Sequence, residues 1–238
     1  MKTLTWFLLL LATALLAQAQ AAPTKLTWYG NSAFQITTPH GAVLVIDPWL
    51  KNPTNPAAKD GRDPVQDFTR VDYILLSHGH FDHIGDAGEL ARKTGAKLIS
   101  TLELGAQMAA HEGYPKNQMS TATLMRAGGE IQVADGEVTV AMVQAIHDGG
   151  LTYKKADGEE EVVYAGNPVG FVIMVKDGPT FYDTGDTAYY SDMKLVGEIY
   201  HPDVGLINIG GHFGMMTPMA VRCAQDSQAK LIIPHHFG

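Results

Sequence analysis

The run His78-Gly79-His80-Phe81-Asp82-His83 places three imidazoles and one carboxylate within a single short stretch of the chain. It begins two residues after a mainly apolar segment, residues 71–76, whose composition is typical of a strand that is buried on both faces. Burying so many polar groups without a shared binding partner would cost much free energy. The run therefore predicts a metal-binding loop at the end of a buried strand.

One such loop can serve two cations. In extended backbone the side chains of His78 and His80 point the same way, whereas Asp82 and His83 are displaced toward a second position. Each cation needs about four to six nitrogen or oxygen ligands, so the four side chains of the loop are too few. Further ligands must come from other parts of the chain.

Polar residues of metal-binding type also follow other apolar segments that are predicted to be strands. These residues are Asp47, His147, Asp186 and the adjacent pair His235 and His236. Loops that leave one edge of a rigid sheet can bring such residues together from distant positions, and we expect that here. Three other histidines lack this context and are predicted to be ordinary core or surface residues: His40, His111 and His201.

The rest of the chain alternates between strand and helix patterns. Strands are predicted at residues 26–29, 33–37, 42–46, 71–76, 97–99, 138–146, 169–175, 180–182, 204–209 and 231–234. Helices are predicted from Asp86, with a capping-box spacing to Glu89, over residues 101–112 and 189–200, and from Thr217 as a cap before Pro218. Residues 154–161 read as a charged loop. The alternation indicates an α/β fold with sheets covered by helices.

The first residues differ in composition from the rest. Lys2 precedes an apolar run at residues 6–16, and small residues follow it up to Ala21. This pattern is typical of a signal peptide, and the run is shorter than the ~20 residues that a membrane span needs. We predict a signal peptide at residues 1–21, one domain at residues 22–238, a periplasmic or secreted location, and no stable membrane insertion after cleavage.

The composition is that of an ordinary globular protein with an excess of acid. Of the 238 residues, 45% are hydrophobic, which is enough for one substantial core. The formal net charge of −8 argues against nucleic acid as a partner, because that affinity comes from clustered Lys and Arg. A small-molecule substrate is expected instead. The single cysteine, Cys223, excludes an intramolecular disulfide and is predicted to pack inertly on a helix.

The run at residues 78–83 resembles the HxHxDH signature of the metallo-β-lactamase superfamily. Further stretches are similar in order and spacing to its lactonase-like branch, which includes ascorbate-phosphate lactonase-type enzymes. These stretches are residues 28–34, 46–48, 147–150, 184–187, 209–213 and 234–238. The resemblance implies a four-layer αββα sandwich and a metal-dependent hydrolase.

The resemblance also implies roles for individual residues. The first ion would be held by His78, His80 and His147, the second by Asp82, His83 and His236, and Asp186 would bridge the two. In this comparison His236 is preferred to His235, and Asp186 to Asp183. Asn31 stands where the branch commonly has histidine, and it is a candidate substrate contact together with His212. The chain ends soon after His236, where relatives usually continue, which indicates a truncated C-terminus.

Two divalent cations, with Zn²⁺ as first choice and Mn²⁺ as the alternative, are expected to share a bridging hydroxide. This hydroxide would cleave an ester, lactone, amide or phosphodiester bond, with Asp82 as the catalytic residue that orients it and transfers a proton. Two alternatives stay open. One is a di-iron redox protein on the same fold, although His80 stands where such relatives have Glu. The other is a periplasmic metal-binding protein without catalysis.

Overall fold

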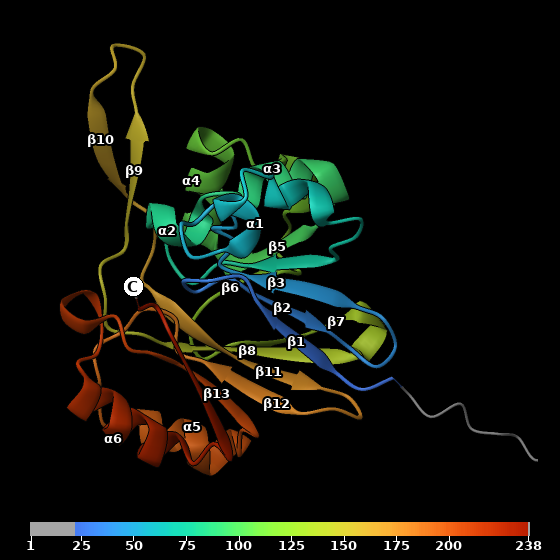
Figure 1. The fold of residues 1–238 in the computed structure, drawn as a ribbon, viewed down its shortest axis with the longest axis vertical. Helices are drawn as coiled ribbons and strands as arrows, with labels where there is room; N and C mark the ends of the chain where they lie inside the picture. Colours follow the sequence, from blue (N-terminus) through green and yellow to red (C-terminus); the bar gives the residue numbers. More distant parts are fainter. Residues whose placement is uncertain (1–21, 238) are drawn as a thin grey trace, which may run out of the picture.

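The computed structural model describes residues 22–237 and arranges them in four layers, with two sheets face to face and helices on both outer sides (Figure 1). This is the predicted αββα sandwich, and the fold prediction is confirmed. The predicted signal peptide lies outside the described residues. Within residues 22–237, no helix is long and apolar enough to cross a membrane.

The N-terminal sheet has six strands in the order of the chain. They are β1 (Lys25–Trp28), β2 (Phe34–Thr37), β3 (Val43–Ile46), β4 (Tyr73–Leu75), β5 (Lys97–Thr101) and β6 (Leu124–Met125). The first three strands form an antiparallel meander, and β3 to β6 then run parallel to one another. The parallel strands therefore present their carboxyl ends at one edge of the sheet.

The C-terminal sheet also has six strands, in the order β14-β13-β12-β11-β8-β7. They are β7 (Glu130–Val133), β8 (Val138–Gln144), β11 (Val169–Val175), β12 (Thr180–Asp183), β13 (Val204–Asn208) and β14 (Leu231–His235). Strands β7, β8, β11 and β12 pair antiparallel, whereas β12, β13 and β14 pair parallel. Each sheet thus joins an antiparallel part to a parallel part, and the parallel part opens onto the same side of the molecule.

Helices cover the outer faces of both sheets (Figure 1). The N-terminal sheet carries α1 (Pro56–Lys59), α2 (Phe81–Ile84), α3 (Ala87–Thr94) and α4 (Leu102–His111), and the C-terminal sheet carries α5 (Met193–Tyr200) and α6 (Thr217–Ser227). Short 3-10 turns are η1 (Pro64–Asp67), η2 (Lys116–Gln118), η3 (Ala134–Gly136) and η4 (Gly211–Phe213). One of these turns, η3, joins the neighbouring strands β7 and β8 of the C-terminal sheet.

Side-chain alternation along the strands explains the layers. In β3, Leu44 and Ile46 pack into the core between the sheets, whereas Val43 and Val45 pack into the core beneath the N-terminal helices. In β11, Phe171 faces the other sheet and its neighbour Val172 faces α5. Such strands are apolar on both faces because each face is covered. Fully burying one such side chain stabilises the fold by about 1.5–3 kcal/mol.

A two-stranded hairpin, β9 (Gly150–Lys154) and β10 (Glu160–Tyr164), projects from the body of the molecule (Figure 1). Its inner face packs on the N-terminal half, where the Tyr153 ring lies 3.7 Å from that of His111 on α4. The charged loop that the sequence predicts at residues 154–161 is therefore only the tip of this hairpin. Two further strands, β6 and β7, were not predicted.

Asp86 is the N-cap residue of α3 as predicted, but its capping-box hydrogen bond is absent, and the predicted cap at Thr217 is wrong. The Asp86 carboxylate does not cap α3; it accepts a hydrogen bond from the backbone N–H of Lys51 at 2.8 Å and lies 3.4 Å from the Lys51 ammonium group. The Asp86 carboxylate thus binds Lys51, in the loop after β3, and does not bind the N–H groups of α3. Thr217 does not cap α6 either, because the cap is Met216 and Thr217 is already helical. The buried position on a helix predicted for Cys223 is confirmed, and its low reactivity stays a prediction.

Candidate metal centre

Residues from the ends of several strands meet at one edge of the sandwich. His78 follows β4, His147 follows β8, Asp186 follows β12 and His236 follows β14, so both sheets contribute. Asp82 and His83 lie on α2, and His80 is the residue that precedes this helix. All seven residues predicted as ligands fall into three overlapping groups whose donor atoms lie within 4.8 Å of one another. The structure thus brings together residues that are up to 158 positions apart in sequence numbering, from His78 to His236.

Three imidazole nitrogens converge in the first group. The Nδ1 atom of His80 lies 2.9 Å from Nε2 of His78 and 3.2 Å from Nε2 of His147. Nitrogens at about 2.0–2.1 Å from a tetrahedral zinc ion would be roughly 3.3 Å apart, close to these separations. Burial lowers the pKa of all three histidines, and the nearby His83 contributes to this for His78 and His80. Neutral imidazoles with free lone pairs are the form that binds a metal.

Beside these three imidazoles, the other two groups together bring two further histidines, His83 and His236, close to two carboxylates, Asp82 and Asp186. Nε2 of His236 lies 3.0 Å from an oxygen of Asp82 and 3.1 Å from one of Asp186. The same Asp186 oxygen lies 3.3 Å from Nε2 of His83 and 3.8 Å from Nε2 of His147. Asp186 therefore stands between His147 and His236, where a bridging ligand would be needed.

A buried nitrogen without a partner tests whether these residues suit a cation. Nε2 of His83 is fully buried, and within residues 22–237 it has no hydrogen-bond partner, although it points toward Asp186. The other ring nitrogen, Nδ1, lies 2.7 Å from an oxygen of Asp47. A histidine that is held by a carboxylate at one nitrogen and left open at the other is the usual arrangement of a metal ligand. The residues present thus fit a metal ion.

The buried carboxylates of Asp47 and Asp186 also favour a positive charge at His83. Burial acts to lower the pKa of His83, but the carboxylates of Asp186 and Asp47 outweigh it and raise that pKa well above its ordinary value. Burial acts to raise the pKa of Asp186. The positive charge on His83 outweighs this effect and brings the pKa of Asp186 below its usual range. A divalent cation between these groups would satisfy the same demand for positive charge.

Comparison with known proteins agrees with this geometry. Residues 43–237 match the model of the beta-lactamase superfamily domain. The chain is 44% identical over 238 residues to a UPF0173 metal-dependent hydrolase of Thermodesulfovibrio yellowstonii. That alignment covers all of this chain and 86% of the relative. A UPF0173 metal-dependent hydrolase of Anaeromyxobacter dehalogenans is 48% identical over 226 residues, covering 93% and 78% of the two chains. A solved metallo hydrolase of Ignicoccus hospitalis is similar with a TM-score of 0.74 and 30% identity, covering 90% and 83%.

The chain belongs to the metallo-β-lactamase superfamily. The family prediction made from residues 78–83 is therefore confirmed. In this superfamily member the alternative residues His235 and Asp183 lie in a layer beneath the cluster. His235 is buried, with Nδ1 3.1 Å from the Ser32 hydroxyl and Nε2 3.6 Å from an oxygen of Asp183. Neither belongs to the three groups that could hold a metal ion.

The two candidate substrate contacts lie in different places. Asn31 lies at the cluster, where its amide Nδ2 donates to the backbone carbonyl of Asp82 at 3.0 Å and to the carboxylate of Asp82 at 3.3 Å. It therefore holds Asp82 rather than pointing freely into solvent. His212 is exposed on η4, with its ring 3.9 Å from the ring of Phe213. Its role as a substrate contact stays a prediction.

Two residues outside the predicted ligand set support the cluster: Asp47, which was expected at this edge of the sheet, and Asn208, which was not. Asp47 accepts hydrogen bonds from the backbone N–H and the hydroxyl of Ser77 as well as contacting His83. Asn208, at the end of β13, donates to Asp186 from its amide, while its amide oxygen accepts from Gly210 and Met215. A signal existed for both, because each is a polar residue at the end of a buried strand.

The backbone at the strand ends turns these side chains inward. Asn31, Asp47 and His236 have left-handed backbone, with φ angles of 45°, 42° and 60°. Such conformations are uncommon outside glycine and cluster at functional sites. At Gly185, which precedes Asp186, φ is 55° and a Cβ atom would lie 2.7 Å from a backbone carbonyl oxygen. The turn that places Asp186 therefore requires glycine.

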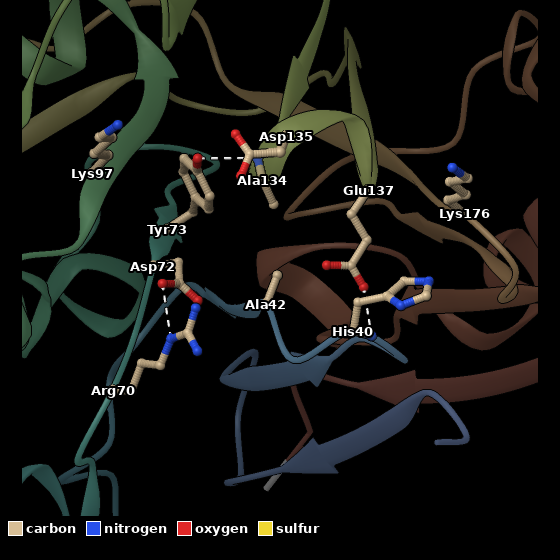
Figure 2. A pocket seen from close by; sticks show the side chains of 10 residues that line it. All are labelled: His40, Ala42, Arg70, Asp72, Tyr73, Lys97, Ala134, Asp135, Glu137 and Lys176. Carbon is tan, nitrogen blue, oxygen red and sulfur yellow. Dashed lines mark hydrogen bonds and ion pairs between the residues drawn. The ribbon is translucent and has the colours of Figure 1, made fainter. Parts of the chain in front are cut away.

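Two of the cavities among residues 22–237 lie at opposite ends of the sandwich. One, of about 420 Å³, adjoins the cluster through Asn31 and His236. The other, of about 620 Å³, is lined by residues near the starts of β4 and β5, such as Tyr73 and Lys97 (Figure 2). Because the cluster lies beyond the carboxyl ends of the parallel strands, this second cavity is remote from it. We therefore assign the substrate side of the molecule to the first cavity.

Proposed function

We propose that the protein is a metal-dependent hydrolase that cleaves an ester, lactone, amide or phosphodiester bond, as in the lactonase-like branch of its superfamily. The convergence of the donor atoms from both sheets carries this proposal. The names of the two bacterial relatives, both metal-dependent hydrolases, support it. The hydroxyl of Ser77, beside His78, donates to the buried carboxylate of Asp47, so water is the proposed attacking group.

In this proposal each half of the cluster holds one divalent cation. His78, His80 and His147 would hold the first, with Zn²⁺ as the preferred metal for three imidazoles and Mn²⁺ as the alternative. The second cation would be held by Asp82, His83 and His236, and Asp186 would contact both. When bound, such cations lower the pKa of a water molecule to about 7 and polarise the bond under attack.

Asp82 is the proposed acid–base residue. Its side chain is 20% exposed, so solvent reaches it, whereas Asp186 is only 3% exposed. As water attacks, Asp82 would accept its proton and deliver it to the leaving group, so that one bond to oxygen forms while the bond to the leaving group breaks. Asn31 would keep the Asp82 carboxylate oriented for this transfer through its two hydrogen bonds.

Metal content and turnover together test the proposal. The purified protein should contain close to two equivalents of zinc or manganese and should hydrolyse at least one member of a panel of esters, lactones, amides and phosphodiesters. A chelator should abolish turnover, and added metal should restore it. The His80→Ala variant should lose the metal at the first site and nearly all turnover. Iron as the dominant metal would favour a redox protein, and retained metal without any turnover would favour a binding protein.

We also propose export to the periplasm or the outside of the cell, because residues 1–21 have the composition of a signal peptide. Expression of the full chain in a bacterial host, followed by fractionation and N-terminal sequencing, tests this. Cleavage after Ala19 or Ala21 is expected. A full-length protein in the cytoplasmic fraction would contradict the proposal.

A further inference from the structure

We infer that the substrate is uncharged and that an apolar acyl or aryl group of it binds in the 420 Å³ cavity beside His236. This inference rests on the proposed hydrolase function and deepens it by naming the substrate class. The cavity volume lies in the range of about 300–1,000 Å³ that is usual for small-molecule sites. The cavity shares Asn31 and His236 with the metal centre, so a group bound in it would hold the scissile bond over the cluster.

Apolar side chains dominate the wall of the cavity. Three aromatic residues, Trp49, Phe213 and Phe237, line it together with Pro53 and Ile209. Phe213 is 64% exposed and Phe237 is 46% exposed. Large exposed apolar side chains that lie together around a cavity are typical of a ligand-binding groove. Their contact with a substrate would remove this surface from water.

The polar side chains in the wall already have partners. The amide of Asn52 donates to the backbone carbonyls of Tyr29 and Trp49, at 2.9 and 2.6 Å. Its carbonyl oxygen accepts from the backbone N–H and the hydroxyl of Thr54 and from the backbone N–H of Asn55, at 2.6–3.0 Å. Asn52 and Thr54 therefore satisfy each other and the surrounding backbone. They therefore have few free hydrogen-bonding groups with which to replace the water that a polar ligand would lose on binding.

Charged side chains are missing from the cavity lining in the described part of the chain. No Lys, Arg, Asp or Glu of residues 22–237 lines it. Lys51 lies two residues after Trp49. Its ammonium group lies 2.6 Å from an oxygen of Glu89, 3.4 Å from one of Asp86 and 3.6 Å from one of Asp63. A phosphate, sulfate or second carboxylate in the cavity would lose its hydration without gaining a partner, which is costly. An uncharged group carries no such cost.

The apolar wall continues past the cavity toward the metal loop. The ring of Trp49 meets that of Phe81 edge to face, with centroids 5.4 Å apart, and Phe81 is 69% exposed. Phe81 lies in the metal-binding run between His80 and Asp82. Trp49 and Phe81 also line a neighbouring cavity together with Lys51, Asp86 and Glu112, so the charged side chains begin beyond the 420 Å³ cavity.

A series of p-nitrophenyl esters measures this preference. Each buried methylene group contributes about 0.8 kcal/mol, so kcat/KM should rise about fourfold per methylene and about 15-fold from the butyrate to the hexanoate ester. The anionic diester bis(p-nitrophenyl) phosphate should be hydrolysed more slowly than the hexanoate ester. The Phe213→Ala variant should lose three- to tenfold in kcat/KM for the hexanoate ester and little for the acetate ester.

Two further variants guard against a general effect on folding. Phe213→Leu keeps an apolar side chain and should retain most of the preference for the hexanoate ester. Ile199→Ala removes an equally exposed apolar side chain, also 64% exposed, from α5 and should leave the kinetics unchanged. A loss of the same size for the acetate and hexanoate esters in Phe213→Ala would overturn the inference. So would equal turnover of all esters in the unmodified protein.

Binding separates this inference from the proposed function. Because Trp49 lines the cavity, addition of 1-hexanol should change the tryptophan fluorescence of the protein in a saturable way. Phe213→Ala should weaken that binding three- to tenfold, and hexyl phosphate should bind at least tenfold more weakly than 1-hexanol. Hexanol binding without hydrolysis of any ester, lactone, amide or phosphodiester of the panel would support the cavity and refute the proposed reaction. Preferred binding of hexyl phosphate would overturn the inference even if esters are hydrolysed.

Discussion

Asp47 shows how one residue outside the predicted ligand set can control the metal centre. It is fully buried, contacts the Nδ1 atom of His83 at 2.7 Å, and accepts from the hydroxyl of Ser77 at 2.6 Å. Asp47→Asn keeps the shape but removes the charge that orients and polarises His83. Loss of such a partner typically lowers metal affinity about 10- to 100-fold. Zinc affinity measured by competition with a chromophoric chelator should fall by that factor.

A second aspartate provides the control for this substitution. Asp72 also accepts a backbone hydrogen bond, from Val43 at 2.8 Å, but it lies at the far end of the N-terminal sheet beside Arg70. Asp72→Asn should change the melting temperature slightly and leave the zinc affinity within twofold of the unmodified protein. Equal losses of zinc affinity in both variants would show that the effect of Asp47 is on stability alone.

The single cysteine gives a prediction about reactivity. Burial within α6, helped by the nearby charge of Asp226, raises the pKa of the Cys223 thiol to about 12. The thiolate is the reactive form, so at pH 8 only about one thiol in ten thousand would be ionised. Native protein should therefore not react with a disulfide reagent such as Ellman's reagent within an hour at pH 8. Protein unfolded in guanidinium should react at once, and rapid reaction in the native state would contradict the buried position.

At the scale of the element, strand positions were predictable and connections were not. Continuous apolar runs such as those of β3 and β11 predict buried strands because both faces are covered, and their ends were predicted within one or two residues. The hairpin β9–β10 was missed because its outer face is polar and its tip is charged, so its sequence resembles a loop. The capping-box hydrogen bond expected at Asp86 is absent because a tertiary contact with Lys51 uses the same carboxylate.

The contact between α5 and α6 gives a prediction about packing. Gly197 of α5 lies so close to the end of α6 that a Cβ atom would meet the backbone carbonyl oxygens of Asp226 and Ser227 at 2.6 and 2.8 Å. Backbone atoms cannot move aside as a flexible side chain can. Gly197→Ala should therefore destabilise the protein by about 1–3 kcal/mol. For a chain of this size, the melting temperature should fall by roughly 2–10 °C.

The neighbouring position on the same helix serves as the control. Glu198 points outward, is 45% exposed and forms an exposed ion pair with Lys194 at 3.1 Å. Glu198→Ala should change the free energy of unfolding by less than about 0.5 kcal/mol, because such surface pairs contribute little. If Gly197→Ala proved as mild as Glu198→Ala in thermal unfolding, the close approach of the two helices would be wrong.

At the scale of the whole molecule, the cluster joins the two halves of the sandwich. His78, His80, Asp82 and His83 follow the N-terminal sheet, whereas His147, Asp186 and His236 follow the C-terminal sheet. The sequence predicted the first set from its compact motif and the second from polar residues at strand ends. Supporting residues such as Asn208 could not be assigned, because hydrogen bonds between distant strands depend on their register in the folded sheet.

A metal ion held by both sheets should stabilise the entire fold. Any ligand that binds only the native state stabilises it, by about 2.7 kcal/mol when its free concentration is 100 times its dissociation constant. In thermal unfolding, zinc at that concentration should raise the melting temperature of the chelator-treated protein by roughly 5–10 °C. His147→Ala removes a ligand of the C-terminal sheet whose side chain is 15% exposed, so the metal-free variant is compared with the metal-free parent to measure any loss of packing separately. It should gain less from zinc, because the first ion would then keep only Asp186 as a ligand from the C-terminal half. A zinc shift of full size in His147→Ala would mean that His147 does not hold the ion.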